Sequence, residues 1–129
     1  MISSKLKNIF ALSIPVFIVH GLEEYFTGFY RIDPLIQDVF GKFSLGLANT
    51  FIVFQIVFWL LLALGLFLVE KNILPRMISV IMGLIILFEF SHIYEAIVIG
   101  GYYPGLITAL VFPIVAFFFW KELIKDIKG

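Results

Sequence analysis

The sequence predicts an all-α membrane protein, a transmembrane bundle with four spans in one domain that covers residues 1–129. Composition is the first indication, because 62% of the residues are hydrophobic and only 14% are charged, whereas soluble domains carry about 25% charged residues. The mean hydropathy is +1.11. Four long apolar stretches and an uneven distribution of basic residues are the second and third indications.

The four apolar stretches lie at about 8–30, 45–69, 77–99 and 105–120 and are separated by polar breaks. Each of the first three is long enough to cross a hydrocarbon core of about 30 Å as a helix. The fourth is short unless the next turn extends it. Each stretch is therefore interpreted as one membrane span.

The basic residues predict the orientation of the spans. Seven of the nine lie on the side that holds both termini and the second loop: Lys5, Lys7, Lys71, Arg76, Lys121, Lys125 and Lys128. Arg31 and Lys42 lie on the other side. Since basic residues collect on the cytoplasmic side, we expect a multi-pass protein of the cell membrane with both termini in the cytoplasm.

The first outer loop, residues 31–44, predicts a short interfacial helix. Asp33 suits the N-cap and Pro34 the first helical position, and Gly41 is expected to end or interrupt the helix. The apolar residues between and after them recur at helical spacing: Leu35, Ile36, Val39, Phe40 and Phe43. An amphipathic helix lying on the outer membrane surface is therefore expected.

Two spans carry the same ionisable pattern, His20-Gly-Leu-Glu23-Glu24 in the first and His92-Ile-Tyr-Glu95 in the third, with Glu89 one turn before His92. A charged group inside a span costs about 2.5–3.5 kcal/mol on insertion scales. Six such groups therefore indicate a compensating use. They are His20, Glu23, Glu24, Glu89, His92 and Glu95.

The matching pattern extends to glycine and tyrosine, since Gly28 and Tyr30 follow His20 at the spacing at which Gly100 and Tyr102 follow His92. This favours an internal repeat of two two-helix units, in which the first and third spans run parallel. The two polar patches would then lie level, about 10 Å below the outer ends of their spans.

The polar patches define a candidate site, because residues three and four apart share a helix face. Asn49 and Gln55 on the second span and Thr108 on the fourth lie in the same outer half and can supply hydrogen bonds. If the first and third spans are adjacent, both histidines should face one cavity.

Charge narrows the chemistry of this site. Four carboxylates at close range cannot all be ionised without compensation, and no lysine or arginine lies near them in the two motif spans. Protons or metal ions are therefore the remaining sources of compensating positive charge. Four Glu and two His match the ligand inventory of di-iron and di-manganese bundles, although those use Glu-x-x-His rather than His-x-x-Glu. One ion held by two His and one Glu would instead be a zinc-hydrolase set that can activate water.

Structural explanations exist for single residues. Glu24 could extend to the headgroups, Glu89 could be a protonated hydrogen-bond donor, and His92 could be a satisfied interior histidine. The tyrosines suit interface anchoring. The equal depth and repeated pattern of the two motifs argue against a purely structural role for both together.

Three sequence elements resemble the HXXEE family of small prokaryotic membrane proteins. They are the H-x-x-E-E of His20–Glu24, the second histidine His92, and the Y-x-P-G of Tyr102–Gly105. The likeness covers about residues 9–120. It implies a site at His20, Glu23, Glu24 and His92 but supplies no reaction. The loop would lie over the site, with Pro104 fixing the turn and Gly105 allowing close approach of the backbone.

The leading hypothesis is an integral membrane enzyme with a His/Glu site, metal-dependent through zinc, iron or manganese, in the outer half of the bundle. A lipid-like or small apolar substrate is expected, because Phe, Leu and Ile wall the site. The expected catalytic residues are His20, Glu23, Glu24, His92 and Glu95, and Glu89 joins them as a metal ligand. The supporting residues are Asn49, Gln55, Tyr94, Tyr102, Pro104 and Gly105.

Several alternatives remain open. Hydrolase and oxidoreductase chemistry are not distinguished, and a metal-free, isomerase-like enzyme could move protons between Glu and His. An ion or proton carrier or sensor would need polar groups in both halves of the spans, and the inner halves have few. A structural accessory protein would leave the six groups unexplained. Membrane lipids are the expected partners, a homodimer is compatible with four short spans, and zero net charge indicates no nucleic-acid partner.

Overall fold

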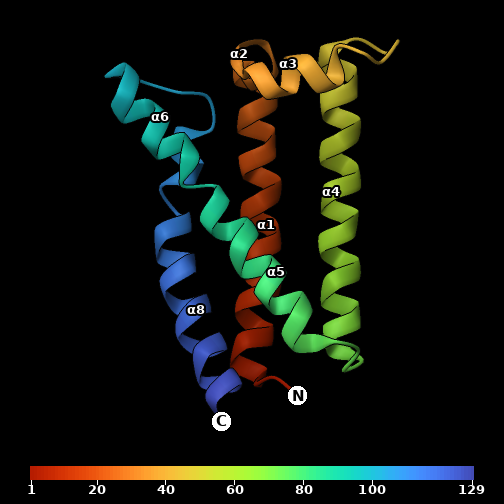
Figure 1. Cartoon of the computed structure of the whole chain (residues 1–129), viewed down its shortest axis with the longest axis vertical. Helices are drawn as coiled ribbons and strands as arrows, with labels where there is room; N and C mark the ends of the chain where they lie inside the picture. Colours follow the sequence, from red (N-terminus) through yellow and green to blue (C-terminus); the bar gives the residue numbers. More distant parts are fainter.

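The computed structural model describes all 129 residues and contains α-helices joined by loops and turns (Figure 1). Four helical segments are long and apolar enough to cross a membrane: Ser4–Thr27, Leu47–Glu70, Pro75–Ile99 and Leu106–Lys128. The predicted four-span, all-α fold is confirmed. The last segment continues beyond the apolar stretch that ends near Trp120, so it is long enough to span after all.

The first two spans are continuous helices. The first, α1 (Ser4–Thr27), begins where the Ser3 hydroxyl accepts a hydrogen bond from the backbone N–H of Leu6 at 3.2 Å. It ends at Gly28, whose φ of 79° is the left-handed conformation that commonly terminates a helix. The second span is α4 (Leu47–Glu70). These two helices form an unbroken first hairpin.

The last two spans are both interrupted. The third consists of α5 (Pro75–Phe88) and α6 (Ser91–Ile99), and the fourth of α7 (Leu106–Ala109) and α8 (Phe112–Lys128). Pro113 explains the second interruption, because proline has no N–H to donate to the carbonyl four residues earlier. At Glu89 and Phe90 the backbone forms tighter bonds, to the carbonyls of Ile86 and Leu87.

Two short helices fill the loop between the first two spans, α2 (Phe29–Ile32) and α3 (Pro34–Phe40). Asp33 accepts a hydrogen bond from the backbone N–H of Ile36 at 2.9 Å and so caps α3. The predicted short helix in this loop is thereby confirmed. Figure 1 shows α3 lying across the ends of α1 and α4, nearly perpendicular to them.

Both termini lie at the same end of the bundle (Figure 1). The backbone N–H of Ser3 donates to Asp126 at 2.8 Å, and Lys5 lies 3.1 Å from the Glu122 carboxylate. The half of the bundle that holds the termini, here called the inner half, is an apolar core in which α1 packs against α4 and α8, and α5 packs against α8 and α4. A smaller apolar cluster of Tyr30, Phe40 and Phe51 lies under α3.

The repeat in the sequence corresponds to equivalent helix ends. Gly28 and Gly100 end α1 and α6 in the same left-handed conformation, with φ of 79° and 72°. The side chains that follow differ, because Tyr30 is buried against Phe51 whereas Tyr102 donates a hydrogen bond to Glu23. The two copies of the pattern thus correspond in the positions of their helix ends but differ in the contacts of their tyrosines.

Candidate functional site

The polar cluster lies between the inner core and the smaller apolar cluster. On α1, His20 and Glu24 are one helical turn apart and share a face, and they are only 1% and 6% exposed. The His20 ring packs edge-on against Phe112 of the inner core, with centroids 5.2 Å apart. A continuous helix therefore delivers two ionisable side chains into the interior.

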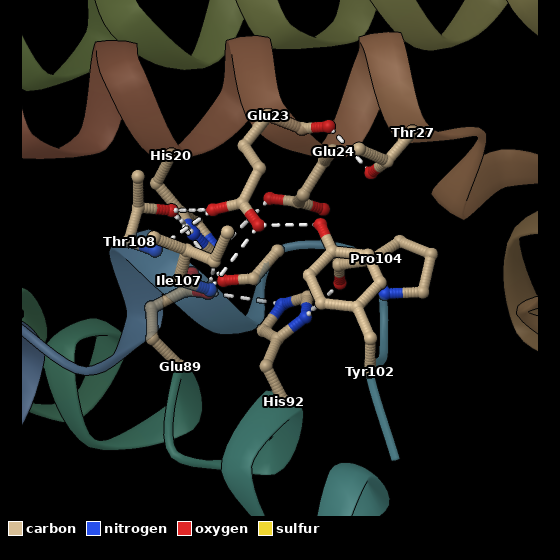
Figure 2. A network of polar contacts seen from close by, with 11 residues as sticks. His20, Glu23, Glu24, Thr27, Glu89, His92, Tyr102, Pro104, Ile107 and Thr108 are labelled. Carbon is tan, nitrogen blue, oxygen red and sulfur yellow. Dashed lines mark hydrogen bonds and ion pairs between the residues drawn. The ribbon is translucent and has the colours of Figure 1, made fainter.

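The interruption of the third span supplies the other half of the cluster. Glu89 caps the end of α5, and His92 lies in the first turn of α6. The tight turn between these helices leaves both side chains directed at His20 (Figure 2). His92 is 4% exposed, and its ring meets that of His20 edge to face at 4.6 Å.

Four side chains converge closely enough to hold one metal ion. His20 Nε2 lies 2.7 Å from Glu89 Oε2 and 3.1 Å from Glu24 Oε1, and His92 Nε2 lies 3.4 Å from the same Glu89 oxygen. One ligand atom from each residue falls within 4.8 Å of all the others. We call these residues, His20, Glu24, Glu89 and His92, the His/Glu cluster.

The other ring nitrogens set the tautomers of both histidines. His92 Nδ1 lies 2.8 Å from the Pro104 carbonyl oxygen, and a carbonyl can only accept, so Nδ1 carries the proton. Thr108 Oγ1 donates to Glu23 at 2.6 Å and lies 2.7 Å from His20 Nδ1. Because that hydroxyl has used its only proton, His20 Nδ1 must donate to it. When neutral, each histidine therefore turns an Nε2 lone pair toward the cluster.

His20 Nε2 is a buried atom without a hydrogen bond of acceptable geometry, although Glu89 Oε2 lies 2.7 Å away. A ring nitrogen and a carboxylate oxygen this close require a positive charge between or beside them, which a proton or a metal ion can supply.

Glu23 turns away from the cluster and binds the start of the fourth span (Figure 2). It accepts hydrogen bonds from the backbone N–H groups of Ile107 and Thr108 at 3.2 and 2.7 Å, and from Tyr102 at 2.6 Å. Burial and the bond to Glu23 raise the pKa of Tyr102, so its hydroxyl stays a donor. Glu23 therefore contacts His20 only through Thr108.

A pocket of about 450 Å³ opens beside the cluster, a volume within the range of about 300–1,000 Å³ typical of small-molecule sites. Its walls come from α1, α3, α4, α5 and α6, and His20, Glu24, Glu89 and His92 all line it. Glu95 also lines this pocket but does not join the His/Glu cluster.

The predicted supporting residues fall into two groups. Gln55 lines the pocket, the Pro104 carbonyl accepts from His92, and Tyr102 binds Glu23. A Cβ on Gly105 would lie 2.7 Å from His92 Nδ1 and 3.0 Å from the His20 ring, so the loop packs directly on both histidines. The other two lie away from the site: Asn49, which donates to the Leu45 carbonyl, and the exposed Tyr94.

Sequence reasoning missed the aromatic side chains around His92 and the backbone contribution to the site. Phe29 and Tyr103 pack on the His92 ring with centroids 5.1 and 5.8 Å away, and the Ile107 N–H binds Glu23. No spacing pattern links these positions to the motif, since the loop brings them there. Only the Y-x-P-G element, in which Tyr103 is the x position, pointed to this region.

The fold and the site define a class, a multi-pass helical membrane protein with a buried His/Glu cluster. A family model described as "Protein of unknown function with HXXEE motif" matches residues 11–119, and the chain belongs to this family. Comparison with curated proteins and with solved structures found no match.

Proposed function

We propose that the protein is an integral membrane metalloenzyme whose His/Glu cluster binds one divalent cation. The observation that carries this proposal is the orientation of the two histidines. Both place an Nε2 lone pair near the same Glu89 oxygen. Lone pairs and a carboxylate repel each other unless a positive charge lies between them.

Ligand number and charge support one ion rather than two. Two ionised carboxylates, Glu24 and Glu89, balance a divalent ion, and two neutral imidazoles complete the set. A second ion would need Glu23 and Glu95, which lie outside the cluster. Metal-binding histidines typically donate their other N–H to a carbonyl or carboxylate. His92 donates to the Pro104 carbonyl, and His20 is joined to the Glu23 carboxylate through Thr108.

A divalent ion would supply Lewis-acid or redox chemistry next to the pocket. Four protein ligands complete a tetrahedral zinc site, whereas a six-coordinate iron or manganese ion would keep two positions for substrate. Zinc would therefore activate water only if one of the four side chains stayed outside its coordination shell, whereas iron or manganese would also permit oxidoreductase chemistry. The pocket walls include six phenylalanines, so the proposed substrate is lipid-like or small and apolar.

A metal-free enzyme is the second candidate, favoured by the 2.7 Å separation of His20 Nε2 and Glu89 Oε2. In that case a proton would occupy the cluster, and His20 would exchange it with Glu89 or the substrate. The Nδ1 protons of the two neutral histidines, which leave both Nε2 lone pairs facing Glu89, argue for the metal instead.

Elemental analysis of detergent-purified protein tests the proposal. The wild type should contain about one equivalent of zinc, iron or manganese, and the double variant His20→Ala/His92→Ala should contain none. Glu95→Gln is the matched control, because this carboxylate lies in the same pocket outside the cluster, and it should keep the metal. Wild-type protein that contains no stoichiometric metal and gains no thermal stability from these ions would favour the metal-free enzyme.

We also propose that the termini face the cytoplasm and the site faces the outer half of the membrane, from the distribution of basic residues. Both termini lie at one end, and the loop that follows α3 and contains Lys42 lies at the other (Figure 1). Topology reporters fused at Lys42 and at the C-terminus should give external and cytoplasmic signals, respectively. An external signal from the C-terminal fusion would place the site on the inner side.

A further inference from the structure

Gln55 is a buried amide that makes no hydrogen bond to another residue. It lies on α4, 5% exposed, and lines the pocket. Its side chain packs against α1 where a Cβ on Gly21 would lie 2.6 Å from Gln55 Oε1. The side-chain hydrogen bonds of the protein leave both ends of this amide free. The amide atoms are not among the fully buried polar atoms that lack a partner, so they reach the space of the pocket, where a ligand can bind them.

The charges of the pocket select against an anionic ligand. Asp33 and Glu95 line it in addition to the two cluster carboxylates, and no lysine or arginine does. If one divalent ion balances Glu24 and Glu89, the pocket remains negative. A phosphate or carboxylate headgroup would meet like charges there, whereas an uncharged polar group would meet a free amide.

The pocket opens sideways, toward lipid. Phe54 on α4 and Phe88 on α5 line it and are 45% and 72% exposed on the surface of a span. At the α3 end of the bundle, α6 leans away from α4 (Figure 1). An apolar chain could therefore enter from the membrane between these helices, along the phenylalanine walls, without crossing water.

We propose that the pocket binds an uncharged amphiphile, with a hydroxyl, ester or amide group hydrogen-bonded to Gln55 and its chain along the phenylalanines. This substrate class deepens the proposed function and depends on it for any reaction. Gln55 is then the residue that determines specificity, since it places the polar group beside His20 and Glu24.

Photolabelling in phosphatidylcholine nanodiscs tests this proposal. The probes are derivatives of dodecanol, dodecanoate and dodecane that carry a diazirine at the same chain carbon, and labelled peptides are located by mass spectrometry. In the wild type, the dodecanol probe should label the pocket-lining segments around Phe54 and Phe88 about tenfold more than either other probe. This ratio is the effect of one buried hydrogen bond.

The variant Gln55→Met keeps the length of the side chain and removes its polar group, so it should lose this preference. Asn49→Leu is the matched control on the same helix, outside the pocket, and should label like the wild type. Equal labelling by the three probes, dodecanoate labelling as strong as dodecanol, or an unchanged preference in Gln55→Met would overturn the proposal. The comparison of probes on the wild type alone decides the matter if Gln55→Met does not fold.

Metal content is measured on the same samples to separate the two proposals. Pocket labelling by dodecanol in a protein without stoichiometric metal would support the uncharged ligand and contradict the metalloenzyme. A metal-loaded wild type without selective labelling would contradict the ligand class alone.

Discussion

The two helical hairpins have the same two-span plan, but only the second is broken. In the first, α1 and α4 run as continuous helices. In the second, the backbone is interrupted after Phe88 and after Ala109. The continuous half holds His20 and Glu24 at a fixed depth. The broken half bends to bring Glu89 and His92 against them.

Interrupted helices are tolerated at membrane depth only where the freed backbone is buried in protein or lines a cavity. Both conditions hold here, since Glu89 lines the pocket and Ala109, whose carbonyl receives no N–H from Pro113, is fully buried. The two copies of the repeated motif therefore lie on helices of different geometry. The first copy lies on the continuous helix α1, and the second lies on a span that is bent between α5 and α6.

The largest expected effect comes from Gly105→Ala in the broken hairpin, with Gly100→Ala as its matched control. Both glycines have positive φ, 91° and 72°, so both substitutions carry a left-handed strain of about 1–2 kcal/mol. Only the Cβ at Gly105 meets the histidine rings, whereas nothing lies within 4 Å of Gly100. Gly105→Ala should weaken metal binding about a hundredfold or more, and Gly100→Ala should leave it near wild type. Equal effects in a metal titration would show that the loop does not position the histidines.

A smaller loss of metal affinity is expected from Glu23→Gln, which alters the hydrogen bonds between α1 and α7. Glu23 holds Thr108, and Thr108 fixes the His20 tautomer. Loss of such an outer partner typically costs 10- to 100-fold in metal affinity. Glu95→Gln should change the affinity little. An unchanged metal affinity in Glu23→Gln would show that the contact from Glu23 through Thr108 to His20 does not contribute to metal binding.

Acidification should release the proposed metal ion, whose ligands would come from both hairpins. Bound metal requires neutral histidines and ionised carboxylates, so protons compete with it. Affinity should fall by about tenfold for each pH unit per proton displaced as the pH is lowered from about 8 to about 5. The check is a competition titration with a chelator at several pH values. A flat profile would mean that the metal binds elsewhere.

The smallest effect is expected from Tyr102→Phe, which removes one hydrogen bond to Glu23 at the rim of the site. The raised pKa of Tyr102 keeps its hydroxyl protonated in the wild type over the working pH range. The substitution therefore removes this hydrogen bond at every pH in that range. The free energy of unfolding should fall by about 1 kcal/mol, and metal affinity should fall only a few-fold. Tyr94→Phe, at an exposed position, serves as the control in thermal unfolding. A loss of metal affinity as large as that in Glu23→Gln would show that Tyr102 is as important as Glu23 for positioning the His/Glu cluster.

The sequence predicted the four spans and the short helix at Asp33 and Pro34, because hydropathy and capping are local properties. It also singled out all four members of the His/Glu cluster by their cost in a membrane. It did not separate Glu23 and Glu95 from them, because helical spacing alone leaves neighbouring positions equivalent. The break at Glu89 lies next to no proline, so the sequence carried no signal for it. The contacts of Phe29 and Tyr103 with His92 depend on how loops fold back, which no periodicity encodes.

X-ray absorption of the protein loaded with zinc tests the central claim most directly, that both hairpins contribute ligands to one ion. Two imidazole nitrogens and two carboxylate oxygens should surround the zinc at about 2.0–2.2 Å. One imidazole should disappear from the spectrum in His20→Ala and one in His92→Ala. Zinc that fails to bind stoichiometrically, or a shell of oxygen ligands that neither substitution changes, would contradict the claim.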